Sequence, residues 1–339
     1  MNQVWTSIGS LGIFAACLVL TVLAGLVGLP LLGRLSVGQT VRDDGPKTHY
    51  VKSGTPTFGG FFFLVPLVLV TVAVQFIYGY SSAILAILLL ILAFGFAGFL
   101  DDYIKVRISK KGLSVRQKTI LLLAFSIGFT LWYLLALPVE PFLIVPGLGS
   151  LPILGWWKLP YGVFVVIYLF FIANSVNLTD GVDGLASSVT VLAGLALAAA
   201  GLLLKGLGLE TALTGPALAV SLMLAAGCLG FLVFNHHPAK VFMGDTGSQA
   251  LGAGVAAIAL FYGVPWILLF IGFIYVAESL SVVIQVAYFK RTGGKRIFRM
   301  SPIHHHFELG GWKENKVVLV FSIVTLLGSV LGLLLLALA

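Results

Sequence analysis

Two adjacent carboxylates, Asp101 and Asp102, follow an apolar run in the stretch FGFAGFLDDYIKVR (94–107). The apolar run predicts a helix that ends just before them, and acids at the negative end of a helix macrodipole are unfavourable by roughly 0.3–1 kcal/mol. A helix end that simply reaches water is the simpler interpretation, but Lys105 and Arg107 already supply the cations that such an end prefers. The pair therefore indicates metal or proton chemistry. Neighbours on a helix point about 100° apart, so the two acids are expected to have different roles.

A second polar cluster is NSVNLTDGVDGLASS (174–188). Asn174 and Asn177 are three residues apart and share one helix face. Asp180 and Asp183 follow, and no lysine or arginine in the loop pairs with them. Capping of the next helix by Asp180 is one interpretation. The other is a loop of oxygen ligands for a hard cation or a ribose hydroxyl.

A third cluster, FMGDTGS (242–248), opens a further apolar segment. Asp245 or Thr246 could act simply as the helix N-cap. Alternatively, Asp245 is a functional carboxylate at a helix N-terminus, where the glycines let a ligand approach backbone N–H groups. Phe242 lies three residues earlier and could stack on a base.

The stretch SPIHHHFE (301–308) contains three successive histidines, His304, His305 and His306. Successive residues on a helix fan out, so the three cannot all bind one ion. One or two of them facing a phosphate is the favoured interpretation. Five cations precede them and point the same way: Lys290, Arg291, Lys295, Arg296 and Arg299.

The stretch DDGPKTHYVKSGTPTFGG (43–60) carries Lys47, His49 and Lys52 before a turn rich in glycine and threonine. It is either a linker or a cationic flap over an anionic ligand.

The elements that must position these groups are membrane helices. The chain has 339 residues, is 59% hydrophobic and 9% charged, and has a mean hydropathy of +1.09, whereas soluble domains carry roughly 25% charged residues. The first segment is not expected to be a cleaved signal peptide, because MNQVW has no cation. Ten apolar segments are predicted to span the bilayer: 8–29, 58–78, 82–100, 119–137, 161–177, 184–204, 212–233, 247–262, 265–289 and 317–338. Segment 247–262 is short and is expected to be tilted or partly buried.

The loops predict the orientation of this single polytopic domain (1–339). Eighteen of the 20 Lys and Arg residues lie in the five loops on one side, which the positive-inside rule assigns to the cytoplasm, with both termini outside. The stretch 138–160 is expected to form an external hairpin with tryptophans at the interface. Cys17 and Cys228 lie in apolar segments and are expected to be packing residues.

The reactive groups gather at the cytoplasmic loops. All six histidines and nine of the twelve acids lie there, whereas a transporter should place polar groups near the bilayer midplane. This distribution favours an enzyme at the membrane face. Glu278 is the one acid within a span, and we expect it to face a neighbouring helix or a subunit contact.

The motifs FLDDYIK, NxxNLTDGxDGLA, FMGDTGS and SPIHHHFE resemble the polyprenyl-phosphate N-acetylhexosamine-1-phosphate transferases. The last, with KTHxxKxGTPTxGG near the N-terminus, resembles the branch that acts on a muramoyl-pentapeptide. The resemblance implies attack of undecaprenyl phosphate on the β-phosphate of UDP-N-acetylmuramoyl-pentapeptide, with release of UMP. It also implies Mg²⁺, a homodimer in the lipid bilayer and no nucleic-acid partner. The alternatives are a sister transferase that uses UDP-N-acetylglucosamine and a transporter of anionic lipid or nucleotide sugar.

The resemblance also implies site residues. Asp245 would bind the metal, and Asp101, Asp102 and His304 would lie with it at the catalytic centre. Asp102 would be either a base or a group that orients the metal or a lysine, because a phosphate monoester with a second pKa of about 6 hardly needs deprotonation. The substrate-binding residues would be Lys52, Thr57, Lys105, Lys118, Asn174, Asn177, Leu178, Asp180, Gly181, Asp183, Phe242, Ser248, Gln285, His305 and His306. Among them, Leu178, Gly181, Asp183 and Phe242 would form a uridine pocket.

Overall fold

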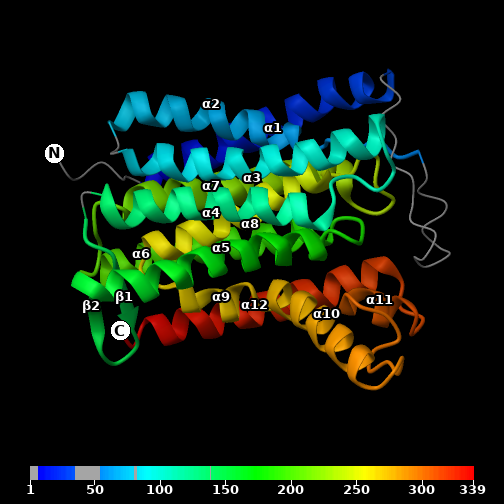
Figure 1. Cartoon of the computed structure of the whole chain (residues 1–339). Helices are drawn as coiled ribbons and strands as arrows, with labels where there is room; N and C mark the ends of the chain where they lie inside the picture. The colour runs from blue at the N-terminus through cyan, green and yellow to red at the C-terminus, as the bar shows by residue number, and fades with distance from the viewer. Residues whose placement is uncertain (1–6, 35–53, 80–81, 138) are drawn as a thin grey trace.

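The computed structural model describes residues 7–34, 54–79, 82–137 and 139–339, and these form a bundle of helices with similar axes (Figure 1). Nine helices in these ranges are long and apolar enough to cross a membrane, which confirms an all-α multi-pass membrane protein. In chain order the helices are α1 (Ser7–Arg34), α2 (Phe61–Tyr78), α3 (Ser82–Arg107), α4 (Val115–Leu135), α5 (Lys158–Thr179), α6 (Leu185–Gly206), α7 (Thr214–Asn235), α8 (Gly244–Phe261), α9 (Leu268–Ile271), α10 (Phe273–Arg291), α11 (Ile303–Glu308) and α12 (Glu314–Leu336).

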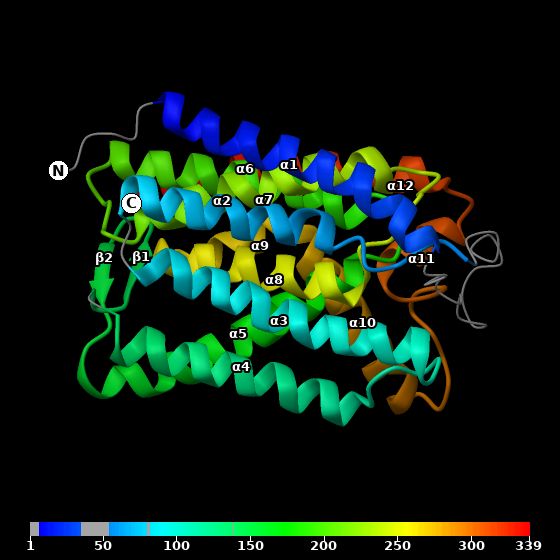
Figure 2. The ribbon, with the colours of Figure 1, turned by 90° about the horizontal axis from the view of Figure 1, so that it is seen from above.

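Helix α8 lies inside the bundle, surrounded by other helices (Figure 2). All of its residues except Asp245 are buried, which confirms the expected burial of segment 247–262. Small residues bring its neighbours close, as is usual where membrane helices pack. Gly98 of α3 lies against the main chain of Asp245, and Gly252 of α8 lies against the main chain of Ala173 in α5. The polar start of α8 is therefore held inside an apolar bundle.

Helix α3 is longer than predicted. It continues past residue 100 to Arg107, so Asp101 and Asp102 lie within the helix and not at its end. The expectation that these acids oppose the macrodipole at a helix terminus is therefore wrong. The last turn instead carries Lys105 and Arg107, the charge that this end favours.

The predicted span 265–289 is interrupted, so a single continuous helix was also a wrong expectation. A short 3₁₀ turn, η3 (Pro265–Ile267), leads into α9, which ends at Gly272. A new helix, α10, begins at Phe273, and its axis is inclined away from the rest of the bundle (Figure 1). Gly272 suits the break because a Cβ at this position would press on the carbonyl oxygen of Leu268.

The expected hairpin is present. Strands β1 (Phe142–Val145) and β2 (Gly149–Pro152) pair antiparallel, and the indole N–H of Trp266 donates to the Ile144 carbonyl over 2.8 Å. Two exposed tryptophans of the 3₁₀ turn η2 (Gly155–Trp157) stack with ring centroids 4.3 Å apart. Exposed tryptophans of this kind are typical of a membrane interface.

The hairpin marks one end of the bundle. Helix α1 begins and α12 ends there, whereas α11 and the start of α8 lie at the opposite end (Figure 1). The assignment of the α11 end to the cytoplasm stays a prediction from the Lys and Arg distribution.

The contact of Gly98 with α8 generates a prediction. A Cβ at residue 98 would overlap the main chain of Asp245 and Thr246, so Gly98→Ala should destabilise the protein by about 1–3 kcal/mol, as overpacking does. The measurement is thermal unfolding in detergent. Gly128→Ala in α4 is the matched control, because no atom lies within 4 Å of a Cβ there. Equal stability of the two variants would contradict the close α3–α8 crossing.

Candidate active site at one end of the bundle

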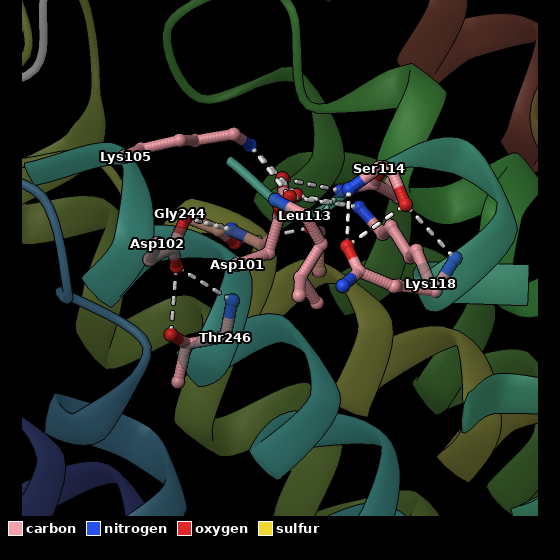
Figure 3. A network of polar contacts seen from close by, with 12 residues as sticks. Asp101, Asp102, Lys105, Leu113, Ser114, Lys118, Gly244 and Thr246 are labelled. Atoms are coloured by element: carbon pink, nitrogen blue, oxygen red, sulfur yellow. Dashed lines mark hydrogen bonds and ion pairs between the residues drawn. The ribbon is translucent and has the colours of Figure 1, made fainter. Parts of the chain in front are cut away.

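The carboxylate of Asp102 caps the first turn of α8 (Figure 3). Its Oδ1 accepts the backbone N–H of Asp245 over 3.1 Å, and its Oδ2 accepts the backbone N–H and hydroxyl of Thr246 over 2.9 and 2.7 Å. Asp102 is 1% exposed. The residue at the N-cap position, Met243, makes no side-chain cap. Of the two interpretations of this stretch, the one in which Asp245 or Thr246 simply caps α8 does not hold, because Asp102 of α3 supplies the cap.

The turn before α8 is shaped to admit this carboxylate. Gly244 has a φ of +71°, and a Cβ on it would meet Asp102 Oδ2 and the hydroxyl of Thr57. Thr57 is buried, and its hydroxyl has no hydrogen-bond partner within the described ranges. Backbone bonds hold this region in place, since Phe242 N–H donates to Pro56 O over 2.9 Å and Gly59 N–H donates to Phe242 O over 2.8 Å. Phe242 itself is half-buried.

Asp101 makes different contacts from Asp102. Its Oδ1 accepts the backbone N–H of Leu113 over 2.6 Å, which ties the loop after α3 to the helix. Its Oδ2 lies 2.8 Å from Lys105 Nζ and 3.2 Å from Lys118 Nζ (Figure 3). Asp101 therefore contacts two lysines from two helices, Lys105 of α3 and Lys118 of α4.

The same lysines contact Asp245. Its Oδ2 lies 2.6 Å from Lys118 Nζ and 2.9 Å from Lys105 Nζ, and its side chain is 16% exposed. Its Oδ1 accepts the amide of Asn177 over 2.8 Å. Four helices, α3, α4, α5 and α8, thus meet at one carboxylate. Two ammonium groups beside it form a site that attracts phosphate oxygens.

The two asparagines of α5 behave differently. The Asn177 amide also approaches the Ser248 hydroxyl over 2.8 Å, which joins α5 to α8. The Asn174 amide donates to Phe170 O in its own helix over 2.7 Å. Asn174 therefore lies outside the hydrogen-bond network around Asp245, although the spacing placed it on the same face.

Asp180 ends α5 and is the one acid of this cluster whose carboxylate has no hydrogen bond or ion pair within the part of the chain that the structure describes. Burial raises the pKa of Asp180 well above its usual value, and the negative charges of Asp245, Asp102 and Asp183 raise it further. A carboxylate without a counter-charge, near other carboxylates, fits a divalent cation. Mg²⁺ is usually held by one or two carboxylates together with water and phosphate oxygens. Asp180 and Asp245 are the residues here that fit it.

The rest of the loop after α5 is divided. Leu178 and Gly181 are half-buried beside Asp180. The carboxylate of Asp183 has partners outside the network around Asp245. It accepts Ala239 N–H over 3.0 Å and lies 3.0 Å from His237 Nδ1.

The three histidines of α11 fan out as predicted. His304 is fully buried and lies 3.0 Å from Glu278 Oε1 through Nδ1. His305 contacts Glu308 over 2.8 Å, and His306 accepts Arg299 N–H over 3.1 Å. The partner of Glu278 was not identified from the sequence, because a contact between residues on two separate helices leaves no local pattern.

Gln285 and Lys52 were also predicted to bind substrate. Gln285 donates to Phe298 O and accepts the N–H groups of Ile297 and Phe298, so it fixes the loop after α10. Lys52 lies outside the described residues. The sequence did not identify Thr246 as a partner of Asp102, because their contact depends on how α3 packs against the start of α8.

The raised pKa of Asp180 generates a prediction about stability. The unfolded carboxyl titrates near 3.9, so between that pH and the folded value the folded protein holds a proton that the unfolded protein releases. The contribution of Asp180 to stability therefore falls as pH rises through this window. Asp180→Asn should gain unfolding temperature relative to wild type as pH increases, without divalent cations, and Mg²⁺ should reduce the difference.

The measurement is thermal unfolding in detergent from pH 5 to 9. Glu210→Gln, which removes an exposed carboxylate at the hairpin end, controls for net charge. A difference between Asp180→Asn and wild type that does not vary with pH would contradict the raised pKa.

Several known proteins are similar to this chain in sequence. The family model described as Glycosyl transferase family 4 matches residues 84–263. A phospho-N-acetylmuramoyl-pentapeptide-transferase of Acetivibrio thermocellus is 47% identical over 323 residues, covering 94% of this chain and 93% of its own. Proteins of the same name from Pelotomaculum thermopropionicum and Listeria monocytogenes are each 44% identical, covering 98% and 94% of this chain and 98% and 95% of their own.

The matched region runs from α3 to the end of α8 and includes Asp101, Asp102, Asp180 and Asp245. The chain therefore belongs to glycosyl transferase family 4, among the phospho-N-acetylmuramoyl-pentapeptide-transferases.

Proposed function

We propose that this protein transfers phospho-N-acetylmuramoyl-pentapeptide from its UDP conjugate to undecaprenyl phosphate, in the cell membrane, giving lipid I and UMP. The names of its relatives support the donor. The observation that carries the proposal is the convergence of Asp245, Lys105 and Lys118 at one end of a membrane bundle. A polar centre at the end of a membrane bundle can bind both a donor from the aqueous phase and an acceptor that is anchored in the membrane.

The two lysines would bind the phosphates of both substrates. In the structure their ammonium groups pair with Asp101 and Asp245. An arriving diphosphate offers more negative charge, so it competes for the same ammonium groups. Once the lysines bind the diphosphate, the carboxylate of Asp245 would be free to bind a cation. Asp180 has no counter-charge within the described residues, so its carboxylate could bind the same cation.

Mg²⁺, when bound, neutralises charge that develops on the phosphate oxygens and on the departing UMP. Asp245 and Asp180 would hold it. The donors support this assignment: both are carboxylates, and that of Asp180 has no protein partner within the described residues.

Asp102 would act as a positioning group more than as a base. Both of its oxygens accept hydrogen bonds from the first turn of α8. A phosphate monoester has a second pKa of about 6 and is mostly a dianion at neutral pH, so the acceptor already is a nucleophile. We therefore assign to Asp102 the role of fixing the position of Asp245, in preference to that of a base.

The remaining assignments follow the family resemblance. Phe242, Leu178 and Gly181 would contact the uridine, with Lys52 and Thr57 nearby, and His305 and His306 would face phosphate or sugar. Asp183 has a supporting role instead, because its carboxylate holds His237 and Ala239. The homodimer stays a prediction.

The proposal is tested by UMP release in detergent with undecaprenyl phosphate and Mg²⁺. Wild type should release UMP from UDP-N-acetylmuramoyl-pentapeptide and not from UDP-N-acetylglucosamine. Asp245→Asn should lower the rate at least about 100-fold, because several kcal/mol of charge stabilisation is lost and each 1.4 kcal/mol is worth tenfold. Removal of Mg²⁺ by a chelator should have a similar effect.

Glu140→Gln is the matched control, since that carboxylate pairs with Lys158 at the hairpin end. UMP release from UDP-N-acetylglucosamine would place the protein in a sister branch of the family. Absence of UMP from both donors, with an acceptor shown to be active, would refute the proposed function and favour transport.

A further inference from the structure

Glu278 and His304 form a fully buried pair between α10 and α11. Both side chains are 0% exposed, and His304 Nδ1 lies 3.0 Å from Glu278 Oε1. The backbone N–H of His304 also points at Glu278 Oε2, over 3.5 Å. The carboxylate therefore contacts both the imidazole and the backbone of the same residue.

The opposite edge of the imidazole has no partner. His304 Nε2 is buried, and it has no hydrogen bond to any residue that the structure describes. It lies against Gly181, where an added Cβ would overlap it. Gly181 is adjacent to Asp180, whose carboxylate is also without a partner in the described part of the chain. The unpartnered nitrogen is thus directed at the candidate site.

A purely structural role explains this arrangement poorly. Burying a charge or a polar group costs free energy unless it is fully paired, and an apolar pair would join α10 to α11 at least as well. A structural pair would also not leave one ring nitrogen buried and unsatisfied. An imidazole held by a carboxylate at one nitrogen presents the other to a ligand in a fixed direction.

We propose that Glu278 is a positioning residue that fixes the imidazole of His304, so that its Nε2 meets a polar atom of the nucleotide-linked phosphosugar beside Gly181. The inference rests on the proposed function and adds a residue to its site. Gly181 is then required because any side chain would occupy the space of this nitrogen.

The test is a double-mutant cycle with Glu278→Gln, His304→Ala and the double variant. Two quantities are measured: UMP release, and binding of UDP-N-acetylmuramoyl-pentapeptide by isothermal titration calorimetry. Glu278→Gln should lower the rate of UMP release, the affinity for the donor or both by about 10–100-fold, the range seen when a metal-binding histidine loses the carboxylate that orients it. In the His304→Ala background the same change should have no further effect, because Glu278 acts only through His304.

Two further variants separate positioning from folding. Gly181→Ala keeps both members of the pair, but its Cβ would displace the imidazole of His304, so it should reproduce the loss of UMP release and donor binding. Because this overlap is with a side chain and not with main chain, it should lower the unfolding temperature less than Gly98→Ala does. Ser279→Ala removes a buried hydroxyl on α10 that bonds Ser175 over 2.7 Å, away from His304, and should keep wild-type activity.

Losses that multiply in the double variant, or a Glu278→Gln protein with wild-type turnover and donor affinity, would overturn the inference. So would a loss explained by a lowered unfolding temperature in Glu278→Gln and absent in Gly181→Ala. If wild type releases no UMP, the proposed function fails, and the binding cycle still decides the role of Glu278, since it needs no turnover.

Discussion

The site depends on one interaction, the carboxylate of Asp102 on the first turn of α8. Helix α8 starts among other helices, and every residue of its first turn except Asp245 is buried, so its free N–H groups need partners within the protein. A carboxylate from α3 satisfies two of them and matches the positive end of the helix macrodipole. Because Asp245 is in that first turn, the same contact fixes the position of the central carboxylate. Gly98 and Gly244 leave the space that this approach requires.

The other charges follow from this placement. The carboxylates of Asp101 and Asp245 alone would repel a phosphate, but Lys105 and Lys118 each contact both of them and compensate their charge. Asp180 has no counter-charge within the described residues, and burial, together with the negative charges of nearby acids, raises its pKa. The centre therefore combines cations for phosphate with spare carboxylates for a metal ion. Such a combination suits phosphoryl transfer, where charge stabilisation supplies most of the catalysis.

Much of this arrangement could be predicted from the sequence. Hydropathy predicted the positions of the helices, and the Lys and Arg distribution predicted that the reactive loops lie together at one end of the bundle. Hydropathy could not show that α3 continues to Arg107, because its last two turns carry four charged residues, Asp101, Asp102, Lys105 and Arg107, and an apolar pattern ends where they begin. Nor could it show the break at Gly272, since the residues on both sides are apolar. The pairing of Glu278 with His304 depends on how α10 and α11 pack, which no local pattern encodes.

The most direct test of the central interaction is hydrogen–deuterium exchange of the α8 amides in Asp102→Ala, with Asp101→Ala as the matched control. If Asp102 caps α8, its loss should speed exchange at Asp245 and Thr246 while the later turns of α8 stay protected. Asp101→Ala should instead affect the amide of Leu113, which that residue holds. Unchanged protection of the first turn of α8 in Asp102→Ala would contradict the claim that this carboxylate sets the position of Asp245.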